Sequence, residues 1–355
     1  MKNIIKTVIV MLTSVSLFAS ANAGELTVNG TAKATYNIES GANKGKGLGI
    51  TNELNFTASG ELDNGYTWSY SMELDPGANI DTGDTTAEQS QSAHNDDTKL
   101  TLSTPYGTVG VFISEGGLDV EDAASQSVYG RPTDIGDPSA TEDNFTIDAY
   151  NNVQYHMPAD MLPFGIVGKI AYAPSTEDVY GSGDSAGGQY DKAAAGAGEN
   201  VTEYQVKAAP LDGLAIGASY IEFAGEGLAK NAQGAESGAY YATYTMGNVG
   251  VGYSKAYKAP LLADNTTSGA EYYDQTNMSI GFAFNDDLSV SYESEKSEKN
   301  FLEVTAAIEQ KSSAVQLAYT MGGMTIALSN GSYDNIGYVA NDDATLTLLA
   351  VTMAF

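Results

Sequence analysis

Residues 62–74 read LDNGYTWSYSMEL and join a tight turn to a strand with two different faces. Asp63, Asn64 and Gly65 are residue types that favour a β-hairpin turn. After this turn, apolar side chains occupy every second position from Tyr66 to Leu74, and Thr, Ser or Glu fills the positions between them. A period of two places alternate side chains on opposite faces of a strand. The stretch therefore predicts the start of a strand with one apolar and one polar face.

The same unit recurs along the chain, and its connections are of two kinds. Alternating runs of about ten residues are separated by either tight turns or long polar stretches. The short turns are Asp63-Asn64-Gly65, Pro105-Tyr106-Gly107, the stretch 158–163, Pro210-Leu211-Asp212-Gly213, Gly247-Asn248, Asn285-Asp286-Asp287 and Gly322-Gly323. The long connections are 37–49, 75–97, 115–148, 174–199, 224–238, 258–272, 296–312 and 329–343.

Eight long connections that alternate strictly with seven short turns predict sixteen antiparallel strands. After residues 1–23, no stretch of 18 residues is apolar enough to form a membrane-spanning helix. A chain without such helices can still span a membrane when its strands close into a barrel. Short turns on one rim and long loops on the other are typical of bacterial outer-membrane barrels. We therefore expect an all-β transmembrane antiparallel barrel over residues 24–355, in a single domain.

The two faces of the strands differ in composition. A soluble β-sandwich also alternates, but its apolar face is rich in Val, Ile and Leu. Here the apolar face is rich in tyrosine, which favours contact with a lipid boundary. The polar face then lines a lumen. By this parity we expect the following charged side chains to form the pore wall: Lys33, Glu53, Glu61, Glu73, Lys99, Lys169 and Lys207. Glu222 and Lys255 depart from the pattern, near strand ends where they can reach water.

The first 23 residues have the layout of a cleaved signal peptide. Lys2 and Lys6 precede an apolar run, and Ala21-Asn22-Ala23 forms a small-residue cleavage site before Gly24. The apolar run is shorter than the roughly 20 residues of a membrane-spanning helix. We expect export through the inner membrane and removal of residues 1–23.

Charge and cysteine content exclude several classes of protein. The formal net charge is −29, and the chain contains no cysteine. Phosphate groups repel such an acidic chain, so nucleic acid is not expected as a partner. Disulfide bonds cannot stabilise an exported chain of this composition.

Several stretches resemble one family. GELTVNGTAKATY at residues 24–36, LSTPYGTVGVFISEGGLDVEDA at 102–123, NNVQYHMP at 151–158 and GIVGKIAYAP at 165–174 are similar to the general porins of Gram-negative outer membranes, nearest to the α-proteobacterial branch. The resemblance implies a sixteen-stranded barrel, a homotrimer, and passive diffusion of small hydrophilic solutes and ions. It also implies that the third long loop folds into the lumen and forms the constriction.

In this chain the third loop is 115–148, the longest of the eight, and it is strongly acidic. It contains nine acidic residues and a single base, Arg131. We expect the following residues at the constriction: Glu115, Asp119, Glu121, Asp122, Arg131, Asp134 and Asp137. Family members commonly place arginines on the opposite wall, whereas this chain has only lysines there. A net negative constriction concentrates cations and repels anions, so we expect a preference for cations and neutral solutes.

Other site types have little support. Gly183–Gly187 reads GDSAG, but it lies in a Gly/Ala-rich stretch without the strand, helix and histidine base of a serine hydrolase. Zinc needs Cys or His ligands, and the chain has only His94 and His156. Calcium is the one metal considered, because loop carboxylates are hard oxygen donors; the candidates are Asp81, Asp84, Asp119, Glu121 and Asp122. Unbound surface acids, and hence no cofactor, are the preferred interpretation.

The last strand carries a separate feature. Leu349, Val351, Met353 and Phe355 share one face, and Phe355 would lie at the lipid boundary of the closing strand. The family resemblance implies that such an ending is read by the outer-membrane insertion machinery. Three other functions stay open from the sequence alone: a substrate-selective porin, a structural or adhesive surface protein, and, with the least support, an outer-membrane enzyme.

Overall fold

The computed structural model describes residues 25–41, 44–75, 94–135, 144–176, 200–224, 233–261, 270–301 and 306–355. The signal peptide predicted for residues 1–23 lies outside these ranges. Among the described residues, no helix is long and apolar enough to cross a membrane. Those that occur are short 3-10 turns: η1 (Glu121–Ala124), η2 (Ile147–Ala149), η3 (Pro163–Gly165) and η4 (Ile336–Tyr338).

The described residues form sixteen strands. They are β1 (Glu25–Glu39), β2 (Gly45–Glu61), β3 (Thr67–Asp75), β4 (His94–Thr104), β5 (Gly107–Ile113), β6 (Asn152–His156), β7 (Val167–Ala173), β8 (Val201–Leu211), β9 (Leu214–Phe223), β10 (Glu236–Met246), β11 (Val249–Ala259), β12 (Ala270–Ala283), β13 (Leu288–Phe301), β14 (Ile308–Met321), β15 (Met324–Asp334) and β16 (Ala344–Ala354).

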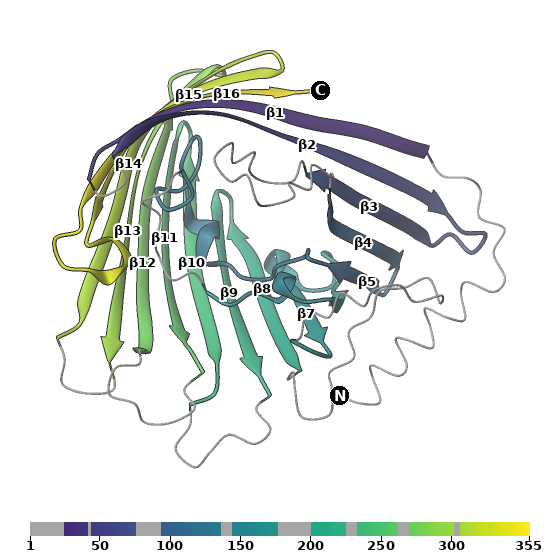
Figure 1. Ribbon diagram of the computed structural model, residues 1–355. Coiled ribbons are helices and arrows are strands. Elements are labelled where there is room, and N and C mark those ends of the chain that lie inside the picture. Colours follow the sequence, from purple (N-terminus) through teal and green to yellow (C-terminus); the bar gives the residue numbers. More distant parts are fainter. Residues whose placement is uncertain are drawn as a thin grey trace, which may run out of the picture.

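Each strand pairs antiparallel with its neighbours in sequence, and β1 pairs with β16 to close the barrel. Figure 1 shows this ring from purple β1 and β2 round to yellow β15 and β16. Closure leaves no unpaired sheet edge, which is the condition for a β-structure to span a lipid bilayer. The predicted sixteen-stranded antiparallel barrel is confirmed.

The seven short turns lie between the strand pairs for which they were predicted. Gly213 and Gly322 have φ values of 76° and 62°, a region that glycine enters without the steric cost of a Cβ atom. Some long connections are shorter than predicted, since β1 continues to Glu39 and β2 starts at Gly45. The predicted connection 37–49 was therefore wrong in its bounds, as were 296–312 and 329–343. At the loop ends of β13–β15 the outward residues are polar, so the apolar alternation no longer marks the strand. In β1 and β2 the outward Ile38 and Leu48 do continue the alternation, between polar residues and glycines.

The outer face of the barrel carries the apolar side chains. Leu349, Met353 and Phe355 are exposed, as their predicted outward position requires. Outward tyrosines concentrate on β6–β14 and are rare on the remaining strands, where Tyr36 and Tyr70 point outward. Those on β6–β14 are Tyr155, Tyr172, Tyr204, Tyr220, Tyr240, Tyr244, Tyr253, Tyr257, Tyr272, Tyr292 and Tyr319. The barrel surface therefore has a tyrosine-rich arc and a mainly aliphatic arc.

Glu222 and Lys255, which depart from the charge pattern, do lie on the outer face. Lys255 pairs with Asp274 at 3.1 Å across β11 and β12. Glu222 lies opposite Glu236 at the loop ends of β9 and β10. Glu222 lies beyond the apolar side chains of β9, where its charge can be solvated, whereas Lys255 lies between the outward Tyr253 and Tyr257 and is balanced by Asp274.

The residue after β16 takes part in closing the barrel. The backbone N–H of Gly30 donates to the carbonyl of Phe355 at 2.8 Å, and the N–H of Phe355 donates back at 3.0 Å. The aromatic ring lies over Gly30, where an added Cβ atom would be 3.0 Å from Cε2. The glycine thus leaves room for the ring at the β1–β16 seam.

Candidate functional site

We call the face opposite the exposed apolar side chains the inner face. The structure places all seven predicted wall residues on it. Glu73 pairs across the strands with Asn55, Lys99 with the buried Phe112, and Lys169 with the buried Gln205. Lys33 faces the ring of Tyr129 at 5.9 Å. Glu53, Glu61 and Lys207 have the same strand parity as these neighbours.

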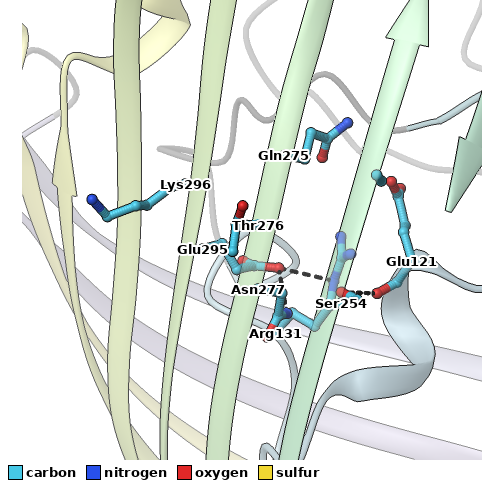
Figure 2. Close-up of a pocket in the computed structure, with 9 residues that line it drawn as sticks. Glu121, Arg131, Ser254, Gln275, Thr276, Asn277, Glu295 and Lys296 are labelled. Carbon is cyan, nitrogen blue, oxygen red and sulfur yellow. Dashed lines mark hydrogen bonds and ion pairs between the residues drawn. The ribbon is translucent and has the colours of Figure 1, made fainter. Parts of the chain in front are cut away.

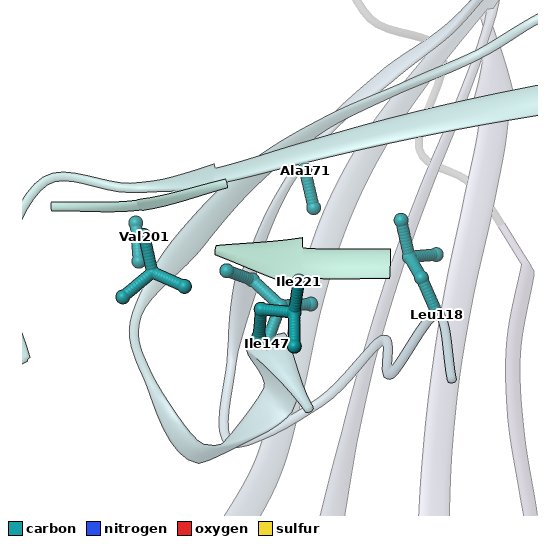
Figure 3. Packing of buried hydrophobic residues seen from close by; sticks show 6 residues of the cluster. Leu118, Ile147, Ala171, Val201 and Ile221 are labelled. Atoms are coloured by element: carbon teal, nitrogen blue, oxygen red, sulfur yellow. The ribbon is translucent and has the colours of Figure 1, made fainter. Parts of the chain in front are cut away.

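The connection 114–151 between β5 and β6, described for 114–135 and 144–151, runs along the inner face of β7–β16 (Figure 1). We call it the inner segment. Its first contact is apolar. Leu118 and Ile147 pack against Ala171, Val201 and Ile221 from β7, β8 and β9 (Figure 3). The hydrophobic clusters of the molecule therefore lie mainly between this segment and the wall.

Buried carboxylates of the wall hold the inner segment by hydrogen bonds. Glu203 of β8 accepts from the backbone N–H groups of Ile147 at 2.9 Å and Leu118 at 3.4 Å. Glu293 of β13, which has no exposed surface, accepts from the hydroxyls of Ser125 at 2.5 Å and Ser127 at 2.6 Å. These contacts bind the segment to the wall at two separate strands, β8 and β13.

Arg131 is the third anchor. It is only 8% exposed and forms ion pairs with Asp122 and Asp134 of the inner segment and, at 3.5 Å, with Glu295 of β13. Glu295 also accepts from the N–H and the hydroxyl of Thr133 at 3.0 and 2.8 Å. Figure 2 shows Arg131 and Glu295 in a small pocket with Asn277 of β12. The single arginine of the chain therefore links two parts of the segment to the wall.

The far end of the inner segment packs on β14–β16. Tyr129 and Ile135 contact Leu346 and Leu348 of β16. The hydroxyl of Tyr333 donates to the carbonyl of Pro132 at 2.7 Å. This packing explains why β16 has apolar residues on both faces: its inner face is covered by the segment and not by water.

The predicted constriction residues divide into three groups. Asp122 and Asp134 are exposed, with 59% and 53% of their side-chain surface accessible. Glu115 forms an ion pair with Lys99 at 2.6 Å. Glu121 is buried, and Arg131 is buried rather than lining the open space as predicted, because three carboxylates surround it. Asp137 lies outside the described residues.

Asp119 lies against the wall. It accepts from the Ser219 hydroxyl at 3.1 Å and from the Glu121 N–H at 3.3 Å. Burial raises the pKa of its carboxyl above the usual value, although these hydrogen bonds oppose the change. Burial likewise raises the pKa of the Tyr129 phenol.

The three carboxylates considered for calcium point to different partners. Asp119 contacts Ser219, Glu121 accepts from the N–H of Asn144 at 3.0 Å, and Asp122 pairs with Arg131. Among the described residues, no group of three or more His, Cys, Asp or Glu side chains has an arrangement that could hold a metal. Asp81 and Asp84 lie outside the described residues.

An open space remains beside the inner segment. A cavity of ≈ 670 Å³ lies between its far end and strands β1 and β2. Its lining includes Lys33, Thr35, Thr51, Tyr129 and Asp134. The cavity is lined by polar and charged side chains and separates the inner segment from the wall. Among these lining side chains, no nucleophile is paired with a base.

The sequence places Glu203 and Glu293 on the polar face, but it does not identify them, or Glu295, as the carboxylates that hold the inner segment. Glu203, Glu293 and Glu295 share the parity of the wall residues, but the pattern does not distinguish an acid in open water from one beneath a loop. The signal available was local: Glu293 and Glu295 are two acids in succession on one face of a strand, SYESEK. Like charges so close on one face require partners.

Comparisons with known proteins agree with this geometry. The sequence profile described as Gram-negative porin matches residues 7–354. A comparison with curated proteins found no match. Similar solved structures include Salmonella typhi OmpF in complex with daunomycin (13% identity, 94% of this chain and 98% of that chain, TM-score 0.68). Others are a loop L8 deletion mutant of OmpT from Vibrio cholerae (14%, 94% and 100%, 0.61) and a mutant porin of Rh. blastica (14%, 93% and 100%, 0.56).

The profile covers nearly all of the sequence, and the closed barrel has the same fold as solved porins over more than nine tenths of the chain. Porins are channels without a catalytic step. The chain therefore belongs to the Gram-negative porin family and is a non-enzymatic channel of the outer membrane.

Proposed function

We propose that this porin passes small hydrophilic solutes and ions by passive diffusion, and that it prefers cations and neutral solutes. In this proposal the inner segment lies in the lumen and forms the constriction. The observation that carries the proposal is the position of the segment: it covers the inner face of β7–β16 and exposes Asp122 and Asp134. Passage is then confined to the space between these carboxylates and the uncovered wall.

The charges around this space favour cations. Acids outnumber bases in the described inner segment, where Arg131 is the one base and is already ion-paired. The wall contributes lysines and glutamates in similar number. Charge in a narrow space with low-dielectric walls acts strongly on passing ions. Diffusion through such a channel requires no cofactor, and we propose that calcium is not needed for conduction.

The reversal potential in a salt gradient tests this selectivity. In planar bilayers with a KCl gradient, the wild-type channel is expected to give the sign of potential that indicates cation preference. Asp122→Asn should lower the cation-to-anion permeability ratio by about twofold, because it removes one exposed charge at the constriction. Glu309→Gln is the matched control, because Glu309 lies on the outer face and pairs with Lys296. Anion preference of the wild type would contradict the proposal.

We also propose that the porin is a homotrimer whose subunits meet through the aliphatic arc of β15, β16 and β1–β5. Tyrosine is favoured where a barrel meets the lipid boundary, and it is sparse on this arc. Trp68, the single tryptophan of the chain, points outward from β3 within the arc. Burial of this arc against a second copy would remove its exposed apolar side chains from lipid.

Fluorescence of Trp68 tests the trimer interface. In vesicles of lipids brominated on their acyl chains, we expect weak quenching of Trp68, since neighbouring subunits would shield it. The control is the double variant Trp68→Phe/Tyr253→Trp, which moves the tryptophan to the tyrosine-rich arc and should be quenched strongly. Equal quenching at both positions would show that Trp68 faces lipid and would contradict this interface.

We further propose an α-proteobacterial origin, export through a signal peptide and an assembly signal at the end of the chain. The motif patches at the start of the chain and around β5–β7 support an origin near the α-proteobacterial branch. The arrangement of residues 1–23 supports export through a cleaved signal peptide. The apolar strand β16 with Phe355 supports recognition by the outer-membrane insertion machinery.

A further inference from the structure

A row of serines on the wall binds the backbone of the inner segment. The hydroxyls of Ser254 on β11 and Ser279 on β12 donate to the carbonyls of Glu121 at 2.7 Å and Ala124 at 2.6 Å. On the flanking strands, Ser219 of β9 accepts from the Val120 N–H at 3.2 Å, and Ser291 of β13 accepts from the Val128 N–H at 3.0 Å. Short side chains that reach main-chain atoms hold the segment very close to the wall.

Glycines between these serines allow that approach. An ideal Cβ atom on Gly252 would lie 2.8 Å from the carbonyl carbon of Ala124 and well inside van der Waals contact with its oxygen. On β12, a Cβ atom on Gly281 would lie 3.0 Å from the carbonyl oxygen of Gln126. Glycine weakens the interior of a strand and often marks a place where another backbone approaches closely. Both glycines lie on the inner face, where η1 crosses β11 and β12.

We infer that this row of small residues is a seat for the inner segment and that Gly252 determines how far the segment projects into the lumen. The inference rests on the proposed role of the segment as the constriction. Gly252 is the critical position because the atom nearest to its ideal Cβ is the backbone carbonyl oxygen of Ala124, which cannot rotate away as the neighbouring Ser279 hydroxyl can. A side chain at this position must push η1 away from β11 by about 1 Å or more to reach ordinary C···O contact.

The direction of this movement is determined by the anchors on both sides. On one side of the seat, Leu118 and Ile147 remain bound to Glu203 of β8, and on the other side Thr133 remains bound to Glu295 of β13. Since the segment is held at both ends, its centre can only bow away from the wall into the open space. Asp122, the exposed acid next to this point, moves with it. The passage becomes narrower while the barrel stays closed.

Gly250 provides a matched control. It lies two residues from Gly252 on the same face of β11, and the atom opposite its ideal Cβ is the side-chain Oε1 of Gln126. A flexible side chain can move aside without displacement of the backbone. Gly250→Ala therefore adds the same methyl group to the same strand and leaves η1 in its seat.

The test combines single-channel recording with structure determination. Gly252→Ala should lower the single-channel conductance by about twofold, because conduction depends on the width of the constriction. Gly281→Ala should lower it less, and Gly250→Ala should conduct like the wild type. In a crystal structure of Gly252→Ala, the Ala124 carbonyl should lie further from β11. If Gly252→Ala fails to assemble, Gly281→Ala provides the same comparison with the smaller displacement.

Two negative results have different meanings. The inference about Gly252 would be overturned if the Ala124 carbonyl did not move in Gly252→Ala and if this variant had the same conductance as Gly250→Ala. A clear displacement of η1 with unchanged conductance would leave the seat intact but contradict the proposal that this segment is the constriction. Higher conductance in Gly252→Ala would also overturn the inference, since the segment would then have left the lumen.

Discussion

Arg131→Ala is expected to loosen the middle of the inner segment and to produce a channel with higher mean conductance and much greater open-channel noise. Arg131 is the one base among the described residues of this segment, and it joins Asp122, Asp134 and Glu295. Its removal leaves Glu295 buried without its cationic partner. Loss of one partner from a buried ion pair costs about 3–5 kcal/mol. We expect this loss of free energy to populate states in which the middle of the inner segment has left the wall.

Planar-bilayer recordings of the purified channel measure this effect. Arg131→Lys should be intermediate, because an ammonium group cannot reproduce the planar arrangement of guanidinium donors. The double variant Arg131→Ala/Glu295→Gln should recover part of the wild-type behaviour, since the uncompensated charge is removed together with its partner. Quiet, wild-type currents from Arg131→Ala would show that the apolar contacts of Leu118 and Ile147 hold the segment without the ion pairs.

Phe355→Ala is expected to reduce the yield of assembled channel by about tenfold, the equilibrium equivalent of about 1.4 kcal/mol. The ring is 67% exposed on the outer face and lies over Gly30 at the seam of β1 and β16. An aromatic ring at this boundary is favourable in lipid. The substitution keeps the two backbone hydrogen bonds to Gly30, so channels that do assemble should conduct like the wild type.

Heat-modifiable migration of outer-membrane fractions on gels measures the assembled fraction. Met353→Ala is the matched control, because Met353 is the next outward residue on β16 and is also exposed. A smaller loss for Met353→Ala would assign the effect to the aromatic ring. Wild-type yield for Phe355→Ala would show that backbone pairing across the seam suffices for assembly.

Much of the barrel could be predicted because its strands and turns are specified by residues that are neighbours in the sequence. Period-two alternation sets the two faces, and turn residues such as Asp63, Asn64 and Gly65 place the hairpins. The parity of Lys33, Lys99 and Lys169 then follows without any knowledge of contacts. Alternation is lost in two places: at the loop ends of β13–β15, where the outward residues are polar, and on β16, where the inner segment covers the inner face.

The inner segment could be recognised as long and acidic, and the family resemblance implied a position in the lumen, but its contacts could not be predicted. The sequence does not distinguish Asp122, which is exposed, from Glu121 beside it, which is buried. Nor could it show that Arg131 is enclosed by Asp122, Asp134 and Glu295, because Glu295 is far away in the chain. These outcomes depend on which wall strand lies opposite each residue of the segment, and that is a matter of long-range packing.

By itself, therefore, the sequence determined the class of structure: a chain predicted to close into a sixteen-stranded barrel with a polar interior. Strand period and turn chemistry act between neighbouring residues, so they can be read directly from the order of side chains. Only the tertiary structure decided which charges face open space and which hold the inner segment. Burial, ion pairing and the close approach of Ala124 to Gly252 arise between residues far apart in sequence, and they exist only once the segment packs against the closed barrel.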